Sequence, residues 1–183
     1  LALQRDFYAY ARQQQQGLWR QHPQRRAGEW PVLVLGRGEM GRATARALAG
    51  MGFPVTGWSR SEGPADAGVT RIAGEAALWQ ALPQARVLIN LLPLTAQTAG
   101  LLNARLFAAL PRGAGVINLA RGRHLVDADL LAALASGQVG HAVLDVFHTE
   151  PLPADHPYWT HAQVTLLPHV AAQTDERSAA AVA

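Results

Sequence analysis

The sequence predicts an α/β domain built on a doubly wound parallel sheet. Short, continuous apolar runs recur from Pro31 onward, and segments of helical periodicity lie between them. Apolar strands of this kind are buried on both faces, which is typical of a parallel sheet covered by helices. The chain has 183 residues, 49% of them hydrophobic, so it can bury one good core, and we expect one domain with appendages.

Residues 1–30 differ from the rest of the chain. Leu3, Phe7, Tyr10 and Ala11 recur at helical spacing, and a polar run of glutamines and an irregular stretch follow them. We therefore expect a helix and a linker. Its aromatic side chains either dock on a partner subunit or pack on this domain or another one.

The elements from Pro31 onward alternate in order. The expected strands are residues 32–36, 55–58, 86–93, 115–120, 141–147 and 163–168. The expected helices are residues 40–51, 75–82, 103–110 and 127–137. Asp127 is expected to cap the last helix, with Asp129 favoured in its first turn, and Gly137 is expected to end it.

The first expected strand leads directly into the glycine-rich loop GRGEMG, which opens a helix. A G-x-G-x-x-G pattern in this setting is typical of a Rossmann-type NAD(P)-binding turn, although a tight turn without a ligand is the alternative. Gly36 permits the turn, Gly38 lets a pyrophosphate approach the backbone, and Gly41 allows close packing of helix on strand. The helix N-terminus, with Glu39 and Met40, offers N–H groups to the phosphates.

The turn WSRS follows the second expected strand, about twenty residues beyond the glycine loop, where an NAD-preferring site carries an acid for the ribose 2′-hydroxyl. Ser59 stands in that place, with Arg60 and Ser61 beside it. An acid would repel a 2′-phosphate, whereas a hydroxyl and a guanidinium bind one. Because every basic residue of this chain is Arg, the missing acid carries more weight than Arg60. We expect NADP(H) to be preferred, with NAD(H) as the alternative cofactor.

Ionisable residues follow three of the later strands: Arg121, Glu150 and His169. The carboxyl ends of parallel strands meet at one edge of the sheet, so we expect these side chains beside the dinucleotide. A histidine is the usual proton donor to a carbonyl oxygen, and a carboxylate bonded to it favours the imidazolium and fixes its orientation. Arg121 offers a bidentate fork to the carboxylate of a 2-oxo acid. The three together predict a catalytic site.

Four ordered motifs resemble the D-isomer-specific 2-hydroxyacid dehydrogenase family: GRGEMG, NLARG, LDVFHTEPLP and LLPHVAA. The segments LINLLPLTAQTAGLLN and WSRS bring the chain closer to the glyoxylate/hydroxypyruvate reductases, the A type in particular. The resemblance extends from about Trp30 to Thr174. It implies an NADPH-dependent reduction of small 2-oxo acids such as glyoxylate and hydroxypyruvate.

The resemblance assigns roles by motif. Arg121 matches the substrate-binding arginine, Glu150 the glutamate paired with the acid, and His169 the acid/base histidine. Asp145 matches a residue that helps to hold the nicotinamide end. Further cofactor-side positions implied by the resemblance are Leu92, Pro93, Thr98, Ala120 and Ala171.

The resemblance also predicts how the chain is divided. In the family the coenzyme domain lies between two halves of a substrate domain, so we expect the substrate domain to be largely absent from this chain. Residues 1–30 would bridge the domains and help to form a homodimer, residues 31–174 would be the dinucleotide-binding domain, and residues 175–183 would start a truncated C-terminal helix. We expect the full-length parent to be an enzyme and the isolated piece to be catalytically impaired.

A non-catalytic dinucleotide-sensing or scaffolding module is the rival interpretation, and the set of Arg121, Glu150 and His169 favours the enzyme because a sensor has no chemical need for all three. The net charge of +3 comes from scattered arginines, which indicates a solvated surface and no nucleic-acid partner. We also expect no membrane segment and no metal site, and the absence of cysteine fits a cytoplasmic protein.

Overall fold

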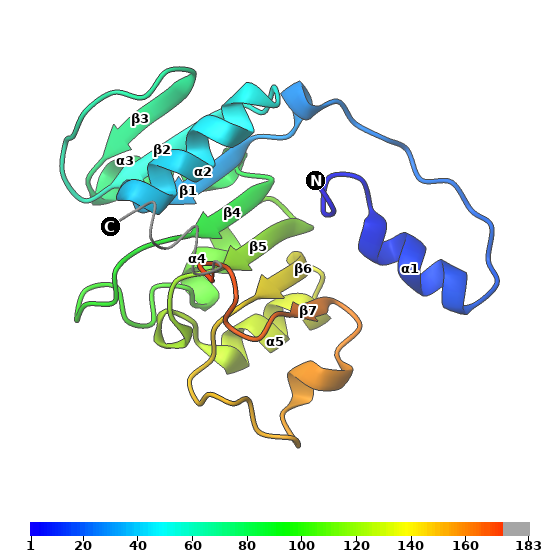
Figure 1. Cartoon of the computed structure of the whole chain (residues 1–183). Helices are drawn as coiled ribbons and strands as arrows, with labels where there is room; N and C mark the ends of the chain where they lie inside the picture. Colours follow the sequence, from blue (N-terminus) through cyan, green and yellow to red (C-terminus); the bar gives the residue numbers. More distant parts are fainter. Residues whose placement is uncertain (174–183) are drawn as a thin grey trace.

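Parallel strands form one seven-stranded sheet in the order β3-β2-β1-β4-β5-β6-β7 in the computed structural model, which describes residues 1–173 (Figure 1). The strands are β1 Val32–Leu35, β2 Val55–Ser59, β3 Val69–Ala73, β4 Val87–Asn90, β5 Ala114–Asn118, β6 Val139–Leu144 and β7 Val164–Leu166. The order reverses between β1 and β4, and this is the point at which ligands bind in open α/β sheets.

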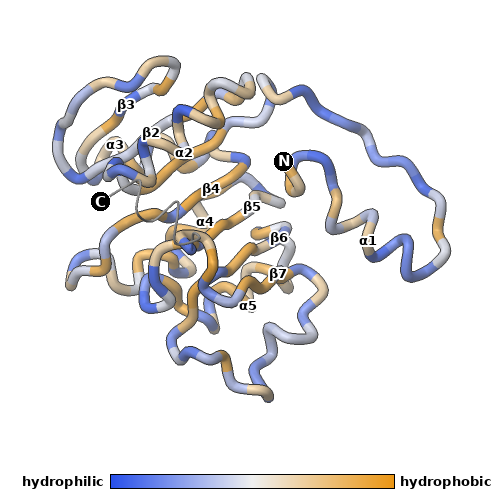
Figure 2. Tube along the Cα trace, viewed as in Figure 1, coloured by the Kyte–Doolittle hydropathy of each residue, from blue (hydrophilic) through white to orange (hydrophobic). Residues whose placement is uncertain are grey.

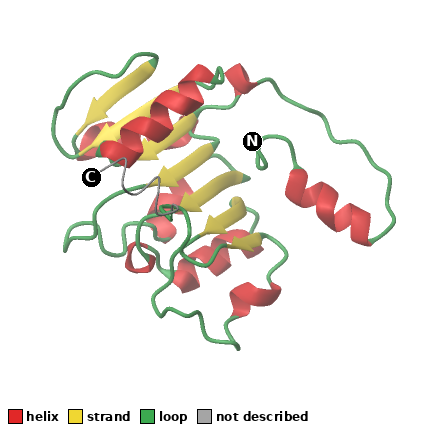
Figure 3. Cartoon of the chain, in the orientation of Figure 1, coloured by secondary structure: helices red, strands yellow, loops and turns green. Residues whose placement is uncertain are grey.

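Helices cover both faces of the sheet (Figure 3). The α-helices are α1 Phe7–Gln15, α2 Glu39–Gly50, α3 Glu75–Ala81, α4 Ala104–Ala109 and α5 Asp127–Ala135. Short 3₁₀ turns are η1 Ala27–Glu29, η2 Leu82–Gln84, η3 Gly122–His124 and η4 Pro157–Thr160. The doubly wound parallel fold expected from the sequence is therefore confirmed.

The central strands β1 and β4 are buried on both sides, because alternate residues point to opposite faces and helices cover each face. Leu33 and Leu35 of β1 belong to the larger core, which the helices α3, α4 and α5 cover. Val32 and Val34 belong to a second core, where Ala45 of α2 packs. The hydropathy colouring shows the apolar strands at the centre of the body (Figure 2).

Two details differ from the sequence prediction. Strand β3 was not expected, because it is an edge strand whose Thr70 and Arg71 are exposed and which therefore lacks an apolar run. The predicted cap at Asp127 is wrong: α5 begins with this residue, and its Oδ1 accepts a hydrogen bond of 2.8 Å from the hydroxyl of Tyr158. Gly137 does follow the helix, with a φ of 72° that favours glycine.

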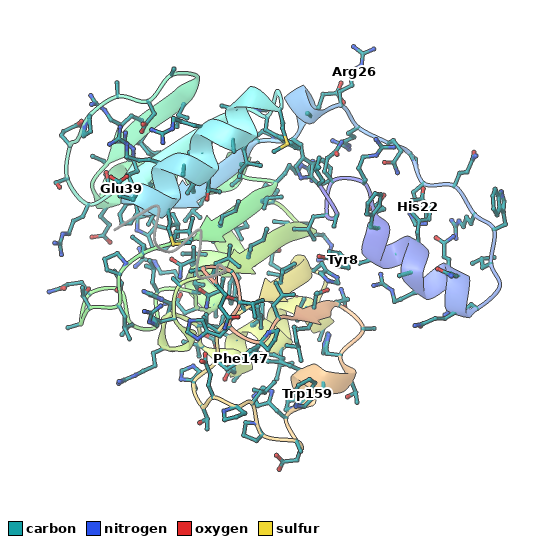
Figure 4. The ribbon with its side chains drawn as sticks, viewed as in Figure 1. Tyr8, His22, Arg26, Glu39, Phe147 and Trp159 are labelled. Atoms are coloured by element: carbon teal, nitrogen blue, oxygen red, sulfur yellow. The ribbon has the colours of Figure 1, made fainter. Side chains whose placement is uncertain are left out.

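The N-terminal arm, residues 1–30, contains the expected helix, α1. This helix lies beside the amino ends of the strands and packs on its own domain. Tyr8 stacks on His141 of β6 with ring centroids 4.2 Å apart, and Arg12 donates to the carbonyl oxygen of Ala162 at 2.9 Å (Figures 1 and 4). Phe7 is 57% exposed and Trp19 is 94% exposed. The arm thus keeps an apolar outer surface after docking.

Residues 1–173 include no helix that is long and apolar enough to cross a membrane. The expected C-terminal helix at residues 175–183 lies outside the described residues.

Candidate active site

The glycine loop joins β1 to α2 with no room for side chains at two of its glycines. Gly36 has a φ of 98°, and a Cβ added there would lie 2.6 Å from the carbonyl oxygen of Leu91. A Cβ added at Gly41 would lie 1.9 Å from the carbonyl oxygen of Gly36. The turn and the close approach of helix to strand therefore both require glycine, as the sequence predicts.

Gly38 has a different reason to be glycine. Its φ of −72° and ψ of −175° suit any residue, and an added Cβ would meet no other atom of the protein within 4 Å. It is also the N-cap residue of α2, where no side chain caps the helix. The open space above this N-terminus fits a phosphate group, which the unpaired N–H groups of the first turn would bind.

An open pocket of about 660 Å³ lies beside this loop. It brings together many of the predicted cofactor-side residues: Gly36, Gly38, Ser59, Arg60, Ser61, Leu92, Pro93 and Thr98. The lining does not include the other predicted positions, which are Glu39, Met40, Gly41, Ala120, Asp145 and Ala171. The pocket has the size and the position of a dinucleotide site at the carboxyl end of the sheet.

A buried pair of asparagines fixes the neighbouring loops, and the sequence reasoning missed it. Asn90 ends β4 and Asn118 ends β5, side by side in register, and the amide of Asn90 donates to Oδ1 of Asn118 at 3.0 Å. The backbone N–H of Leu92 donates to Asn90, and Asn118 donates to the carbonyl oxygen of Arg121. The available signal was an Asn at the end of each of two apolar runs.

A second missed residue, His124, joins the same loops. It is fully buried, with Nδ1 at 3.1 Å from the carbonyl oxygen of Arg121 and Nε2 at 3.3 Å from that of Pro93. The Arg121 side chain itself is exposed and donates to the carbonyl oxygen of Ala120 at 2.6 Å.

His169 and Glu150 form the predicted pair at this edge of the sheet. Nδ1 of His169 lies 2.7 Å from Oε2 of Glu150, while Oε1 accepts a 2.8 Å hydrogen bond from the N–H of Phe147. Partial burial raises the pKa of Glu150, but the hydrogen bonds from His169 and Phe147, with the charges of His169 and Arg121, outweigh it and lower this pKa below its ordinary value. The carboxylate therefore stays ionised and orients the imidazole.

Asp145, at the end of β6, fixes the loop that carries His169. Its two carboxylate oxygens accept hydrogen bonds from the N–H groups of Val170 at 2.8 Å and Ala171 at 3.0 Å, and the residue is only 1% exposed. His169 itself has a φ of 55°, a left-handed conformation that is uncommon for a residue with a side chain. The predicted contact between Asp145 and the cofactor stays a prediction, because both oxygens already bind the loop.

The fold defines a dinucleotide-binding domain of the Rossmann type, and the hydrogen-bonded pair of His169 and Glu150 lies at the carboxyl end of its sheet, outside the lining of the pocket. A profile of the family described as "D-isomer specific 2-hydroxyacid dehydrogenase, NAD binding domain" matches residues 1–171. The chain belongs to this family, as the motifs in the sequence predict.

The proteins to which this chain is similar include named reductases and 2-hydroxyacid dehydrogenases. A glyoxylate/hydroxypyruvate reductase A of Yersinia enterocolitica is 48% identical over 165 residues, which are 90% of this chain and 52% of that protein. A D-isomer specific 2-hydroxyacid dehydrogenase of Xanthobacter autotrophicus Py2, solved with NADPH and MES, is 43% identical with a TM-score of 0.93, over 98% of this chain and 74% of that one. An NADPH-dependent glyoxylate/hydroxypyruvate reductase of Sinorhizobium meliloti, solved with NADP and sulfate, is 40% identical with a TM-score of 0.92, over 97% and 57%.

The chain spans about half the length of the curated relatives that it matches. The activity of those relatives is therefore a property of proteins about twice as long as this chain.

Proposed function

We propose that the whole protein reduces small 2-oxo acids, such as glyoxylate and hydroxypyruvate, to 2-hydroxy acids with NADPH, and that this chain is its coenzyme-binding part. The hydrogen-bonded pair of His169 and Glu150, at the same carboxyl end of the sheet as the glycine loop, is the observation that carries the proposal. The names of the similar reductases support the choice of substrate class.

The residues of this chain divide the chemistry among them. A bound nicotinamide supplies the hydride, and the carbonyl oxygen must then receive a proton. Glu150 holds Nδ1 of His169, which leaves Nε2 to deliver that proton. Arg121 would bind the carboxylate of the substrate through its guanidinium fork. Asp145 keeps the His169 loop in place while the proton moves.

We propose NADP(H) as the preferred cofactor because no acid stands where the ribose 2′-position is read. Ser59 ends β2 and its hydroxyl donates to the carbonyl oxygen of Ser61 at 2.8 Å, while Arg60 is exposed at the pocket. Arg60→Ala should lower the affinity for NADPH and leave that for NADH nearly unchanged. Equal discrimination before and after the substitution would contradict this assignment.

We also propose that the whole protein is a cytoplasmic homodimer in which the arm contacts the partner subunit. Phe7, Leu18 and Trp19 remain exposed on the arm although it docks on its own domain. Trp19→Ser should shift the mass measured by light scattering towards a monomer, whereas an unchanged mass would remove this surface from the interface.

Steady-state assays of the whole protein with both cofactors and a panel of 2-oxo acids test the function. His169→Ala should abolish turnover while cofactor affinity stays largely intact, because the imidazole acts on the substrate. His161→Ala is the matched control, since His161 lies before the amino end of β7, at the other end of this strand from His169, and should retain turnover. Unchanged turnover in His169→Ala would refute the mechanism, and cofactor binding by the wild-type protein without any turnover would favour the sensing module.

A further inference from the structure

A buried carboxylate lies behind the cofactor pocket, just before β3. The side chain of Asp66 is 1% exposed and binds two guanidinium groups, with Oδ2 at 2.8 Å from Nη2 of Arg37 and Oδ1 at 2.8 Å from Nε of Arg42. A third arginine, Arg46, lies 3.6 Å away and is half exposed. The two hydrogen bonds, first that from Arg37 and then that from Arg42, lower the pKa of Asp66, so it stays ionised.

Arg37 reaches this carboxylate from the middle of the glycine loop. Its stem crosses β2 at Gly57, where an added Cβ would lie 3.3 Å from Cδ of Arg37. Its guanidinium also donates to the carbonyl oxygen of Pro64, and the side chain is 6% exposed. The arginine therefore ties the glycine loop to the segment between β2 and β3.

The segment that Arg37 holds comes directly after Ser59 and forms one wall of the pocket. Residues 60–64, which include Arg60 and Ser61, line the pocket. Arg71 of β3 holds the same segment from the other side, because it donates to the carbonyl oxygen of Gly63 and pairs with Glu62 at 3.3 Å. The side chains of Arg37 and Arg71 thus hold residues 60–64 in a fixed position relative to the glycine loop.

We propose that Asp66 and Arg37 are positioning residues for cofactor selection, which hold residues 60–64 where Ser59, Arg60 and Ser61 meet a ribose 2′-phosphate. The inference rests on the proposed NADP(H) site. The pair also keeps the charge of Asp66 neutralised and buried, so that this acid does not repel the phosphate. A nucleotide without a 2′-phosphate does not depend on residues 60–64 in this way.

Titration calorimetry of the chain with two probes tests the inference: adenosine 2′,5′-bisphosphate, and 5′-AMP, which lacks the 2′-phosphate. Asp66→Asn should weaken binding of the bisphosphate about tenfold, the value of one charge-assisted hydrogen bond, and change 5′-AMP binding less than about twofold. A role in folding alone would weaken both probes together, and that result would overturn the inference.

Two further variants complete the design. Gly57→Ala pushes on the Arg37 stem without touching Asp66, and should lower the bisphosphate-to-AMP ratio in the same direction. If a thermal unfolding scan shows that Asp66→Asn does not fold, Gly57→Ala alone tests the inference. Arg46→Ala is the matched control, because Arg46 is half exposed and approaches Asp66 only to 3.6 Å, so the pair of Arg37 and Asp66 stays in place and the ratio should not change.

Different results would overturn the proposed cofactor site and the positioning role of Asp66 and Arg37. A wild-type chain that binds neither probe would overturn the cofactor site, and this inference with it. A wild-type chain that binds both, with an unchanged ratio in Asp66→Asn and Gly57→Ala, would overturn the inference alone.

Discussion

Asp145→Asn should release the loop that presents His169 while the sheet stays folded. The carboxylate of Asp145 accepts two backbone hydrogen bonds, from Val170 and Ala171. An asparagine can accept only one of them, and it turns its NH₂ group towards the other N–H. The loop therefore loses one charge-assisted hydrogen bond and gains an unpaired donor in a buried place.

The magnitude follows from these two contacts. Loss of a hydrogen bond to a buried charged group costs about 2 kcal/mol, which is roughly a thirtyfold rise in the equilibrium for local opening. The left-handed conformation of His169, with its φ of 55°, stores about 1–2 kcal/mol that favours the opened loop. In the opened loop the imidazole leaves its place beside Glu150, so the kcat of the whole protein should fall in proportion to the fraction of molecules that are open.

Hydrogen exchange of the chain measures the effect directly. The amides of Val170 and Ala171 should exchange roughly thirtyfold faster in Asp145→Asn, while the amides of the central strands keep their protection. The matched control is Asp129→Asn. The carboxylate of Asp129 accepts a hydrogen bond of 2.8 Å from the N–H of Ala104, so this variant should speed exchange only at Ala104. Unchanged exchange at Val170 and Ala171 in Asp145→Asn would refute the role assigned to this carboxylate.

Three further predictions concern stability and cofactor binding. Burial, with nearby positive charges, lowers the pKa of His141 from 6.5 to about 4, so its contribution is complete above pH 6.5 and disappears as the pH falls towards 4. The free energy of unfolding of His141→Phe, measured with urea, should therefore fall by about 3 kcal/mol less than that of the wild type over that interval, and parallel pH curves would contradict this. Gly41→Ala should unfold the domain or lower its melting temperature strongly, because the added Cβ would lie 1.9 Å from a backbone oxygen. Gly38→Ala should keep the fold and weaken binding of 5′-AMP. Melting curves and titration calorimetry would show the two effects. Ser59→Asp should invert the preference from NADPH to NADH in the whole protein, and a retained NADPH preference in steady-state assays would argue against the reading of this position.

The sequence predicted the parts of the site that depend on local chain structure. A glycine pattern between an apolar run and a helical segment specifies the turn at Gly36 and Gly41, because only glycine fits the backbone there. The parallel order of apolar strands also predicts that Arg121, Glu150 and His169 share one edge, since parallel strands end on the same side. The missed strand β3 had no such signal, because an edge strand needs no apolar run.

The sequence alone determined, then, a glycine turn between a strand and a helix, a position after the second strand without an acid, and the end of the sheet at which the ionisable residues lie. Only the tertiary structure decided which side chains hold these parts in place. Arg37 and Asp66 are 29 residues apart, and Asn90 and Asn118 are 28 apart, and neither pairing follows from a local pattern. The physical reason is that a hydrogen bond between distant residues depends on strand register and loop path, which are set when the whole sheet packs.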